Sequence, residues 1–415
     1  MNITRVLDSL KPLGKPISSL LFHPSSEDYI VVASEDSSLR LLDLKTQRPL
    51  CAVVGFPFEI SGMVFEKDSP EKFNEKDWGN VWVACGSDVH LLKLSAAPKF
   101  LRRFEPASVL RSLPNLSKDE INSLCLTEEA NALGWCGDDG KLGIIDLETF
   151  NKKYMKGKHS NIAGAVSFVP GRPTTLLSIG YDSTARSWDT SSSVMLDFLS
   201  LNPPPGSQSN NLAPSFPLCL STYLLPPASS VEAESEQDGE EPLIAIGTAD
   251  GSIWITLPSR LIASDRSTET AENDTGFSKK DLKKKKNKKS GKNTLWKGIK
   301  EGSLERVEIA LGPIIKVAYI PCPPSEHKFS EGLPYLVTLS HLGVLTIHRF
   351  GRSNKYRMDV STVLTWNTDS IVKCNTLAVS AGCPRENPGS KVRIAVGGVG
   401  SKGEGFMECW DVEFD

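Results

Sequence analysis

Three residues between positions 159 and 182 have the side-chain types of a hydrolase triad. His159 could act as a general base, Ser178 as a nucleophile, and Asp182 as the carboxylate that orients the imidazole. The nucleophile of such enzymes commonly lies in a sharp glycine-framed turn, and the segment LLSIG around Ser178 does not have that pattern. We therefore predict that the trio has a structural role and that the protein is not an enzyme.

Other residues that could carry chemistry are scattered. The six histidines show no metal-ligand spacing. Residues 397–405, GGVGSKGEG, superficially resemble a phosphate-binding loop, but they lack the GxxxxGK[ST] pattern and precede the strand-like FMECWD instead of a helix. We interpret this segment as a hairpin turn, and we predict neither a metal ion nor a cofactor.

The segment that contains the trio is one copy of a repeat. In residues 158–189, two apolar runs are followed by Asp182, which precedes the final Asp189 by seven residues. The two other clear copies have the same gap between two aspartates. Seven copies can be recognised, at residues 16–43, 59–94, 120–146, 158–189, 242–257, 313–350 and 370–411.

Each copy contains three short β-runs, and a fourth can follow, as in LCAVVG (50–55) or KKYMKG (152–157). The runs are almost continuously apolar, which indicates strands that are buried on both faces. A doubly wound α/β fold would need helices of about ten or more residues between the strands, and none is indicated. We predict an all-β, seven-bladed β-propeller as a single domain over residues 1–415, with residues 3–10 as the closing strand of the last blade.

The central repeats resemble WD40-repeat proteins. The residues that carry this resemblance are DEINSLCL (119–126), DDGKLGIIDLE (138–148) and the stretch 158–189 that ends in ARSWD. The resemblance implies that four residues form a structural tetrad inside one blade. In this tetrad the imidazole donates to the carboxylate and accepts from the hydroxyl, which accepts from the indole. The residues are His159, Ser178, Asp182 and Trp188.

The same resemblance implies a protein-interaction scaffold, and more specifically a substrate receptor of a cullin–RING ubiquitin ligase. Such receptors commonly dock through a Trp-Asp-x-Arg box at the end of a blade's third strand. The blade ends here read WDTS (188–191), LDLK (42–45), IDLE (145–148) and WDVE (410–413), so the arginine is missing. Lysine, present only at Lys45, cannot reproduce the bidentate fork of arginine.

Composition limits the partners and the compartment. The net charge of −3 does not by itself favour nucleic acid. No apolar run approaches the roughly 20 residues of a membrane helix, and the first residues do not resemble a secretory signal. Nine singly spaced cysteines indicate reduced thiols. We expect a monomeric propeller in the nucleus, the cytoplasm or both, with protein partners and no membrane contact.

Two insertions near the fifth blade are predicted to be disordered: the acidic residues 226–242 and the lysine-rich residues 258–300. Three interpretations of the lysine run remain open, namely a nuclear targeting signal, a contact with RNA in a nuclear or nucleolar assembly factor, and a solvated spacer. The basic residues at its centre are Lys283, Lys284, Lys285, Lys286, Lys288 and Lys289.

The repeat geometry also predicts which residues meet on one rim of the propeller. These are the positions just before each inner strand and just before each tight-turn aspartate, and five of the seven are acidic. They could provide solubility only, or they could form a negative funnel for a basic peptide with Tyr181 as an aromatic anchor. The lysine-rich insertion could also fold back onto this rim. The residues are Glu35, Glu59, Glu120, Asp138, Tyr181, His341 and Asp369.

Overall fold

The structure is a computed structural model, and it describes most of the chain. The described residues are 1–7, 14–66, 77–95, 100–105, 109–203, 214–226, 240–256, 298–299, 303–310, 312–321, 333–354, 357–380 and 391–414. The lysines predicted to form the basic run, 283–289, lie outside these ranges, as do residues 227–239 of the acidic insertion.

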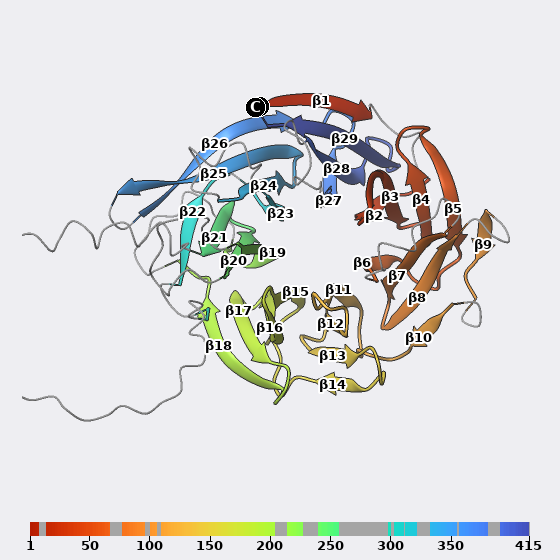
Figure 1. Ribbon diagram of the computed structural model, residues 1–415, viewed down its shortest axis with the longest axis horizontal. Helices are drawn as coiled ribbons and strands as arrows, with labels where there is room; N and C mark the ends of the chain where they lie inside the picture. Colours follow the sequence, from red (N-terminus) through yellow and green to blue (C-terminus); the bar gives the residue numbers. More distant parts are fainter. Residues whose placement is uncertain are drawn as a thin grey trace, which may run out of the picture.

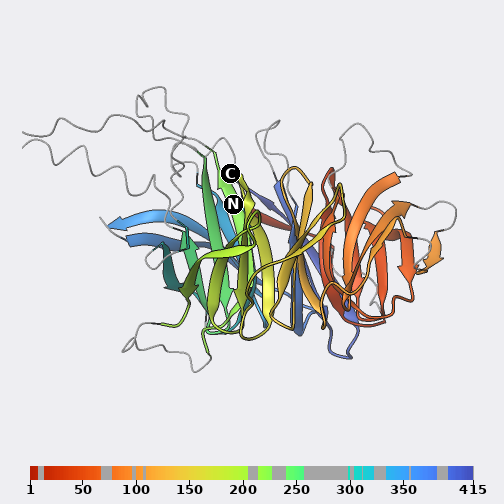
Figure 2. The same ribbon diagram turned by 90° about the horizontal axis from the view of Figure 1, so that it is seen from below.

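The described strands form seven antiparallel sheets that are arranged around a central axis (Figure 1). The predicted seven-bladed β-propeller is therefore confirmed. The strands run between the two faces of the ring (Figure 2). The first three blades contain β2 (Ile17–His23), β3 (Ser26–Ser34), β4 (Ser38–Asp43) and β5 (Arg48–Val54); β6 (Ile60–Phe65), β7 (Asp77–Cys85), β8 (Asp88–Ser95) and β10 (Arg111–Leu113); and β11 (Ile121–Leu126), β12 (Ala132–Gly137), β13 (Leu142–Asp146) and β14 (Lys152–Tyr154).

The fourth, fifth and sixth blades follow the same order from the inner strand to the outer strand. They contain β15 (Ala163–Val169), β16 (Arg172–Gly180), β17 (Thr184–Asp189) and β18 (Val194–Ser200); β19 (Pro217–Leu225), β20 (Glu241–Thr248), β21 (Ser252–Thr256) and β22 (Leu304–Glu308); and β23 (Ile314–Ile320), β24 (Tyr335–Ser340), β25 (Val344–Asn354) and β26 (Arg357–Asn367).

The seventh blade is built from both ends of the chain. Its first three strands are β27 (Lys373–Val379), β28 (Lys391–Val399) and β29 (Gly405–Glu413), and β1 (Asn2–Leu7) pairs antiparallel with β29. The sequence suggested such a strand over residues 3–10; in the structure it covers Asn2–Leu7, and residues 8–13 lie outside the described part. This pairing covers the edge of β29, which would otherwise be open to another strand.

The first blade has a fifth strand that the repeat pattern did not suggest. β9 (Leu101–Arg103) pairs in parallel with the outer strand β5. It belongs to the segment between the second and third repeats, which also provides β10 as the outer strand of the second blade. The segment is therefore more than a link, because it adds one strand to each of two neighbouring blades.

The hydrophobic core is divided into seven clusters, one at each contact between neighbouring blades. The cluster between the third and fourth blades, for example, joins Cys136 and Leu142 to Phe168, Leu176 and Trp188. Every residue of β20 is buried, as expected for a strand that is covered by blades on both sides. The apolar runs of the sequence are thus explained by packing between blades.

Two predicted boundaries need correction. Glu241 and Pro242 were included in the acidic insertion but belong to β20, because the strand extends along its partner Leu224–Leu225. Ile299 was included in the lysine-rich insertion, yet it is buried in the cluster between the fourth and fifth blades, where its side chain loses contact with water.

Within the described ranges there is no helix, and consequently none that is long and apolar enough to cross a bilayer. The seven cysteines in these ranges form no disulfide.

Candidate functional site at the openings of the central channel

The four tetrad residues are connected by hydrogen bonds in the fourth blade. His159 lies before β15, Ser178 is on β16, Asp182 is in the turn before β17, and Trp188 is on β17. The Trp188 indole donates to Ser178 Oγ at 2.9 Å, and Ser178 Oγ lies 2.8 Å from His159 Nε2. His159 Nδ1 lies 3.0 Å from Asp182 Oδ1. Since Ser178 accepts from the indole, its own proton can be donated to Nε2.

Two further residues extend this network. Thr184 Oγ1 donates to Asp182 Oδ1 at 2.7 Å, and Arg186 Nη2 donates to Asp182 Oδ2 at 2.9 Å. Burial opposes ionisation of Asp182, but the hydrogen bonds from Thr184 and His159 outweigh it and lower the pKa of Asp182 to about 2. Burial also lowers the pKa of His159, which favours the neutral imidazole.

Two glycines make room for His159. A Cβ atom on Gly180 would lie 2.3 Å from His159 Nδ1, so only glycine fits beneath the ring. Gly140 has a φ of +76°, and its Cβ would lie 2.4 Å from the carbonyl oxygen of His159. The His159 amide donates to the Gly140 carbonyl at 2.9 Å, which fixes the histidine to the third blade.

The serine, histidine and tryptophan of the tetrad are buried. Ser178 and His159 have no exposed surface, and Trp188 is 1% exposed. A nucleophile must reach a substrate carbonyl, and Ser178 is enclosed by the side chains with which it bonds. The tetrad therefore stabilises the fourth blade, and the backbone bond of His159 also connects this blade to the third.

One opening of the central channel is lined by carboxylates, and we call it the acidic mouth. The concave site has a volume of about 390 Å³ and is lined by Glu35, Glu59, Glu120, Asp138 and Tyr181, together with polar and small residues of the inner strands. These five residues come from the first four blades, from the turns that precede inner strands or connect the second and third strands. The structure therefore brings together five of the seven residues predicted to form the rim.

Mutual repulsion acts among these carboxylates. The pKa of Glu120 is raised by burial first, and then by the negative charges of Glu59 and Asp138. Burial, followed by the charge of Glu35, also raises the pKa of Glu59. Tyr181 packs against Phe216, with 5.0 Å between ring centroids, so its ring is held beside the carboxylates. A cation in this opening would reduce the repulsion.

The two other predicted rim residues have different neighbours. His341 lies in the turn between β24 and β25, where its amide donates to Pro313 O at 3.0 Å. Asp369 precedes β27 and pairs with Arg5 of β1, and Arg5 also contacts the fully buried Glu408 at 3.1 Å. Neither residue lines the acidic mouth: the backbone of His341 is bound to Pro313, and the carboxylate of Asp369 is directed to Arg5 of β1.

Four side-chain hydrogen bonds between successive inner strands, made by residues that line the acidic mouth, were not predicted from the sequence. At the second or third position of four inner strands, a polar side chain donates to the first residue of the next inner strand. Asn375 Nδ2 donates to Ile17 O at 3.0 Å, and Asn122 Nδ2 donates to Ala163 O at 3.1 Å. Ser18 and Ser61 make the corresponding bonds to Ile60 and Ile121. The sequence signal for these bonds is the Ser or Asn that recurs near the start of these four inner strands.

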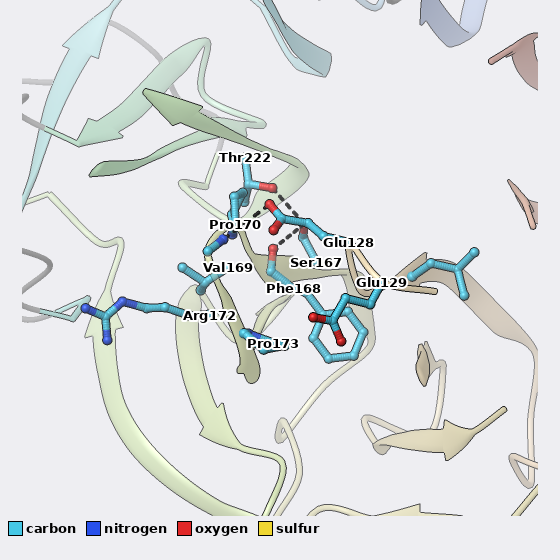
Figure 3. Close-up of a pocket in the computed structure, with 11 residues that line it drawn as sticks. Glu128, Glu129, Ser167, Phe168, Val169, Pro170, Arg172, Pro173 and Thr222 are labelled. Atoms are coloured by element: carbon cyan, nitrogen blue, oxygen red, sulfur yellow. Dashed lines mark hydrogen bonds between the residues drawn. The ribbon is translucent and has the colours of Figure 1, made fainter. Parts of the chain in front are cut away.

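The other opening of the channel has a different lining. A pocket of about 370 Å³ lies at the far ends of β11 and β15 and includes Glu128, Glu129, Phe168, Arg172 and Thr222 among its lining residues (Figure 3). Glu128 extends toward Pro170 and accepts from the Gly171 amide at 3.2 Å, whereas Arg172 points away from it. The two openings therefore differ, with four carboxylates at one and a mixed lining at the other.

The attachment of the lysine-rich insertion bears on whether it could reach the acidic mouth. The insertion follows Thr256 of β21 and precedes Leu304 of β22, and these two residues are paired. Thr256 Oγ1 accepts from the amide of Ile244. The strand partner of Ile244 is Thr222, which lines the pocket with the mixed lining. The described ends of the insertion thus lie toward the face opposite the acidic mouth.

In the described part of the chain, no group of three or more His, Cys, Asp or Glu residues could hold a metal ion. No family model matches the chain. The fold and the site together define a seven-bladed β-propeller with an acidic opening to its channel.

Proposed function

We propose that this chain is a non-catalytic WD40 protein-interaction scaffold whose acidic mouth binds a basic segment of a partner protein. The observation that carries this proposal is the convergence of four carboxylates and Tyr181, from four blades, on one concave site. Burial raises the pKa of Glu59 and Glu120 first, and the neighbouring carboxylates raise it further; a lysine or arginine side chain would relieve this repulsion. The ring of Tyr181 offers a rigid surface to its alkyl stem or guanidinium.

The assignment to WD40 proteins is supported by the tetrad and by the repeats that resemble that family. A blade with the sequence pattern of 158–189 contains the hydrogen-bonded His159, Ser178, Asp182 and Trp188. Because a propeller fold occurs in proteins of many functions, the proposed function is based on the acidic mouth and not on the fold.

The test is a binding titration with a fluorescein-labelled peptide of alternating arginine and alanine, followed by anisotropy at several salt concentrations. The double variant Glu59→Gln/Glu120→Gln should weaken binding by about tenfold, equivalent to about 1.4 kcal/mol. The matched control is Glu148→Gln/Glu413→Gln, which removes two exposed carboxylates outside the site and should leave binding unchanged. Equal affinity of the wild type and the first variant would contradict the proposal, as would tighter binding of a glutamate–alanine peptide.

As a finer proposal, the scaffold serves as a substrate receptor of a cullin–RING ubiquitin ligase. Its support is the similarity of residues 119–189 to WD repeat-containing protein 53. The missing arginine of the docking box means that the ligase's propeller adaptor would have to contact another surface. The test is affinity purification of the full chain from cells, in which we expect the adaptor to co-purify. If the adaptor is not recovered even after cross-linking, the proposal is wrong.

A second candidate is a nuclear or nucleolar assembly factor that contacts RNA through the lysine run 279–292, which contains nine lysines. Clustered lysines gain affinity for phosphates from counterion release, so binding should weaken steeply with salt. Deletion of 279–292 should abolish retention on RNA while leaving peptide binding at the acidic mouth intact.

A further inference from the structure

A groove on the outer circumference, distinct from both channel openings, lies beside the junction of the third and fourth blades. It has a volume of about 450 Å³ and is lined by Lys141, Leu142, Tyr154, Met155, Gly157 and Lys158. We call it the lateral groove. These residues belong to the turn before β13, to the start of β13, to the end of β14 and to the connection between β14 and β15.

The floor of the lateral groove is held in place by backbone contacts with the fourth blade. The Lys156 amide donates to Ser193 O at 2.7 Å, and Lys158 O accepts from Arg186 Nη1 at 2.7 Å. Gly157 has a φ of +138°, and its Cβ would lie 3.3 Å from the Trp188 ring, so the chain passes directly over the indole. A preformed floor lowers the conformational cost of binding a ligand.

An exposed apolar strip lies on β18, the outer strand of the neighbouring fourth blade. Leu196 and Phe198 are 50% and 59% exposed, and Val194 and Met195 are also exposed. Phe198 is the strand partner of Arg186, the residue that contacts Lys158. Contiguous exposed apolar residues of this size are a feature of interaction surfaces.

The outer edge of β18 differs from that of the first blade. There, β9 pairs with the outer strand β5, whereas in the described ranges no strand pairs with the outer edge of β18. The chain itself thus shows that an extended segment can add to the outermost strand of a blade. The same addition to β18 would place the side chains of the added segment next to the apolar strip.

Positive charge surrounds the lateral groove. Its charged lining residues are Lys141 and Lys158, and Lys152 and Lys156 are exposed in the same segment, KKYMKGK. Lys158 Nζ donates to the carbonyl of Asp139 at 3.2 Å, and Lys141 Nζ lies 3.4 Å from the Asp139 carboxylate. No carboxylate is among the lining residues. The complementary ligand is therefore apolar in its centre and acidic at its margins.

We propose that the lateral groove and the β18 strip together bind an extended segment of a partner protein in which large apolar side chains alternate with Asp or Glu. An apolar side chain fills the groove above Met155 and Gly157, and an adjacent carboxylate pairs with Lys141 or Lys158. A second apolar side chain contacts Phe198. This site has the opposite charge preference to the acidic mouth, so the two can be occupied by different segments.

The test uses a fluorescein-labelled peptide that alternates Leu or Phe with Asp or Glu, and a matched peptide in which the acidic residues are replaced by Lys. We expect saturable binding of the acidic peptide and at least about tenfold weaker binding of the basic one. The charge variant Lys141→Glu/Lys158→Glu and the apolar variant Phe198→Ser should each weaken binding of the acidic peptide by about tenfold. The controls are Lys402→Glu and Leu342→Ser, which alter an exposed lysine and an exposed leucine outside the groove.

Melting temperatures of all variants identify any that fail to fold, and Phe198→Ser remains informative if the lysine variant is destabilised. Equal binding of the acidic and basic peptides would overturn the proposal. Unchanged affinity of both groove variants would do the same. A concentration-dependent dimer in sedimentation velocity that Phe198→Ser abolishes would assign this surface to a second copy of the chain and would also overturn it.

Discussion

Arg393 donates to both carboxylate oxygens of Asp411, from Nε at 2.6 Å and from Nη2 at 3.1 Å. The third nitrogen of the guanidinium contacts Asp28 of the first blade at 3.1 Å. Arg393 thus joins the seventh blade to the first at the closure of the ring. Its side chain is 5% exposed, and the fork geometry is one that lysine cannot provide.

Removal of this guanidinium should strongly destabilise the ring. In Arg393→Ala, the carboxylates of Asp411 and Asp28 lose a shared partner, and we expect the free energy of unfolding to fall by about 3 kcal/mol. Lys391→Ala is the control, because Lys391 also contacts Asp411 but is 41% exposed; its effect should stay below about 1 kcal/mol. Urea unfolding followed by tryptophan fluorescence measures both. Equal effects of the two substitutions would show that burial of the guanidinium is unimportant.

Stability should decline as the pH falls. Burial opposes ionisation of Asp411, but hydrogen bonds from Arg393 and Lys391 lower its pKa in the folded protein, and the pKa of Asp182 is lowered to about 2. The unfolded chain therefore binds protons more readily, so these contributions are present above about pH 4 and are lost as the pH falls toward the folded values. The lowered pKa of His159 acts in the same direction, beginning below the ordinary value of 6.5.

The measurement is the melting temperature between neutral and acidic pH. Asp182→Asn should melt at a lower temperature at neutral pH and show a shallower decline on acidification. An identical pH profile for the variant and the wild type would exclude Asp182 as a source of this dependence.

The tetrad should contribute to stability and not to catalysis. His159→Ala removes the imidazole that bonds both Asp182 and Ser178 and leaves a buried space between them, and it should cost about 1–3 kcal/mol. Trp188→Phe keeps most of the packing, removes the donor to Ser178, and should cost about 1 kcal/mol. His341→Ala, outside the network, is expected to change stability by less than about 0.5 kcal/mol. Full stability of His159→Ala combined with loss of an esterase activity would contradict this interpretation.

Each of the hydrogen bonds between inner strands should make a small, independent contribution to the free energy of unfolding. Asn375→Ala removes the bond from the seventh blade to Ile17 of the first, and Asn122→Ala removes the bond to Ala163 of the fourth. Each should cost about 1 kcal/mol, with Asn122→Ala also losing the bond to Asp138, and the double variant should show the sum because the two residues share no hydrogen-bond partner. Ser401→Ala, in an exposed turn, serves as the control. A double variant as stable as either single variant would argue against independent contributions.

Deletion of residues 1–7 should expose the edge of β29. The pairing from Asn2 with Glu413 to Leu7 with Cys409 would be lost, together with the burial of Leu7. We expect a markedly lower melting temperature and concentration-dependent aggregation through the open edge. Light scattering during thermal unfolding measures both. The point variant Arg5→Ala, which keeps the strand, should lower stability without promoting aggregation.

The sequence by itself determined the number of blades, and its resemblance to WD40 repeats implied the members of the tetrad. Each repeat carries its own strand pattern and turn residues, and the bonds among His159, Ser178, Asp182 and Trp188 lie largely within one repeat. Local strand patterns of this kind can be recognised because sequence spacing sets strand pairing within a repeat. The same reasoning placed Glu35, Glu59, Glu120, Asp138 and Tyr181 on one face, since equivalent positions of successive blades emerge together.

Only the tertiary structure decided the contacts that join distant repeats. Asp411 looks like the terminal aspartate of any repeat, yet it is bound by Arg393 and lies beside Asp28, which is remote in sequence. Asp369 was expected on the rim but pairs with Arg5 of β1. The pairing of β9 with β5 and the exposure of Phe198 on β18 likewise depend on how neighbouring blades pack. Such contacts are set by ring closure and by the lengths of the outer strands, which a repeat pattern does not encode.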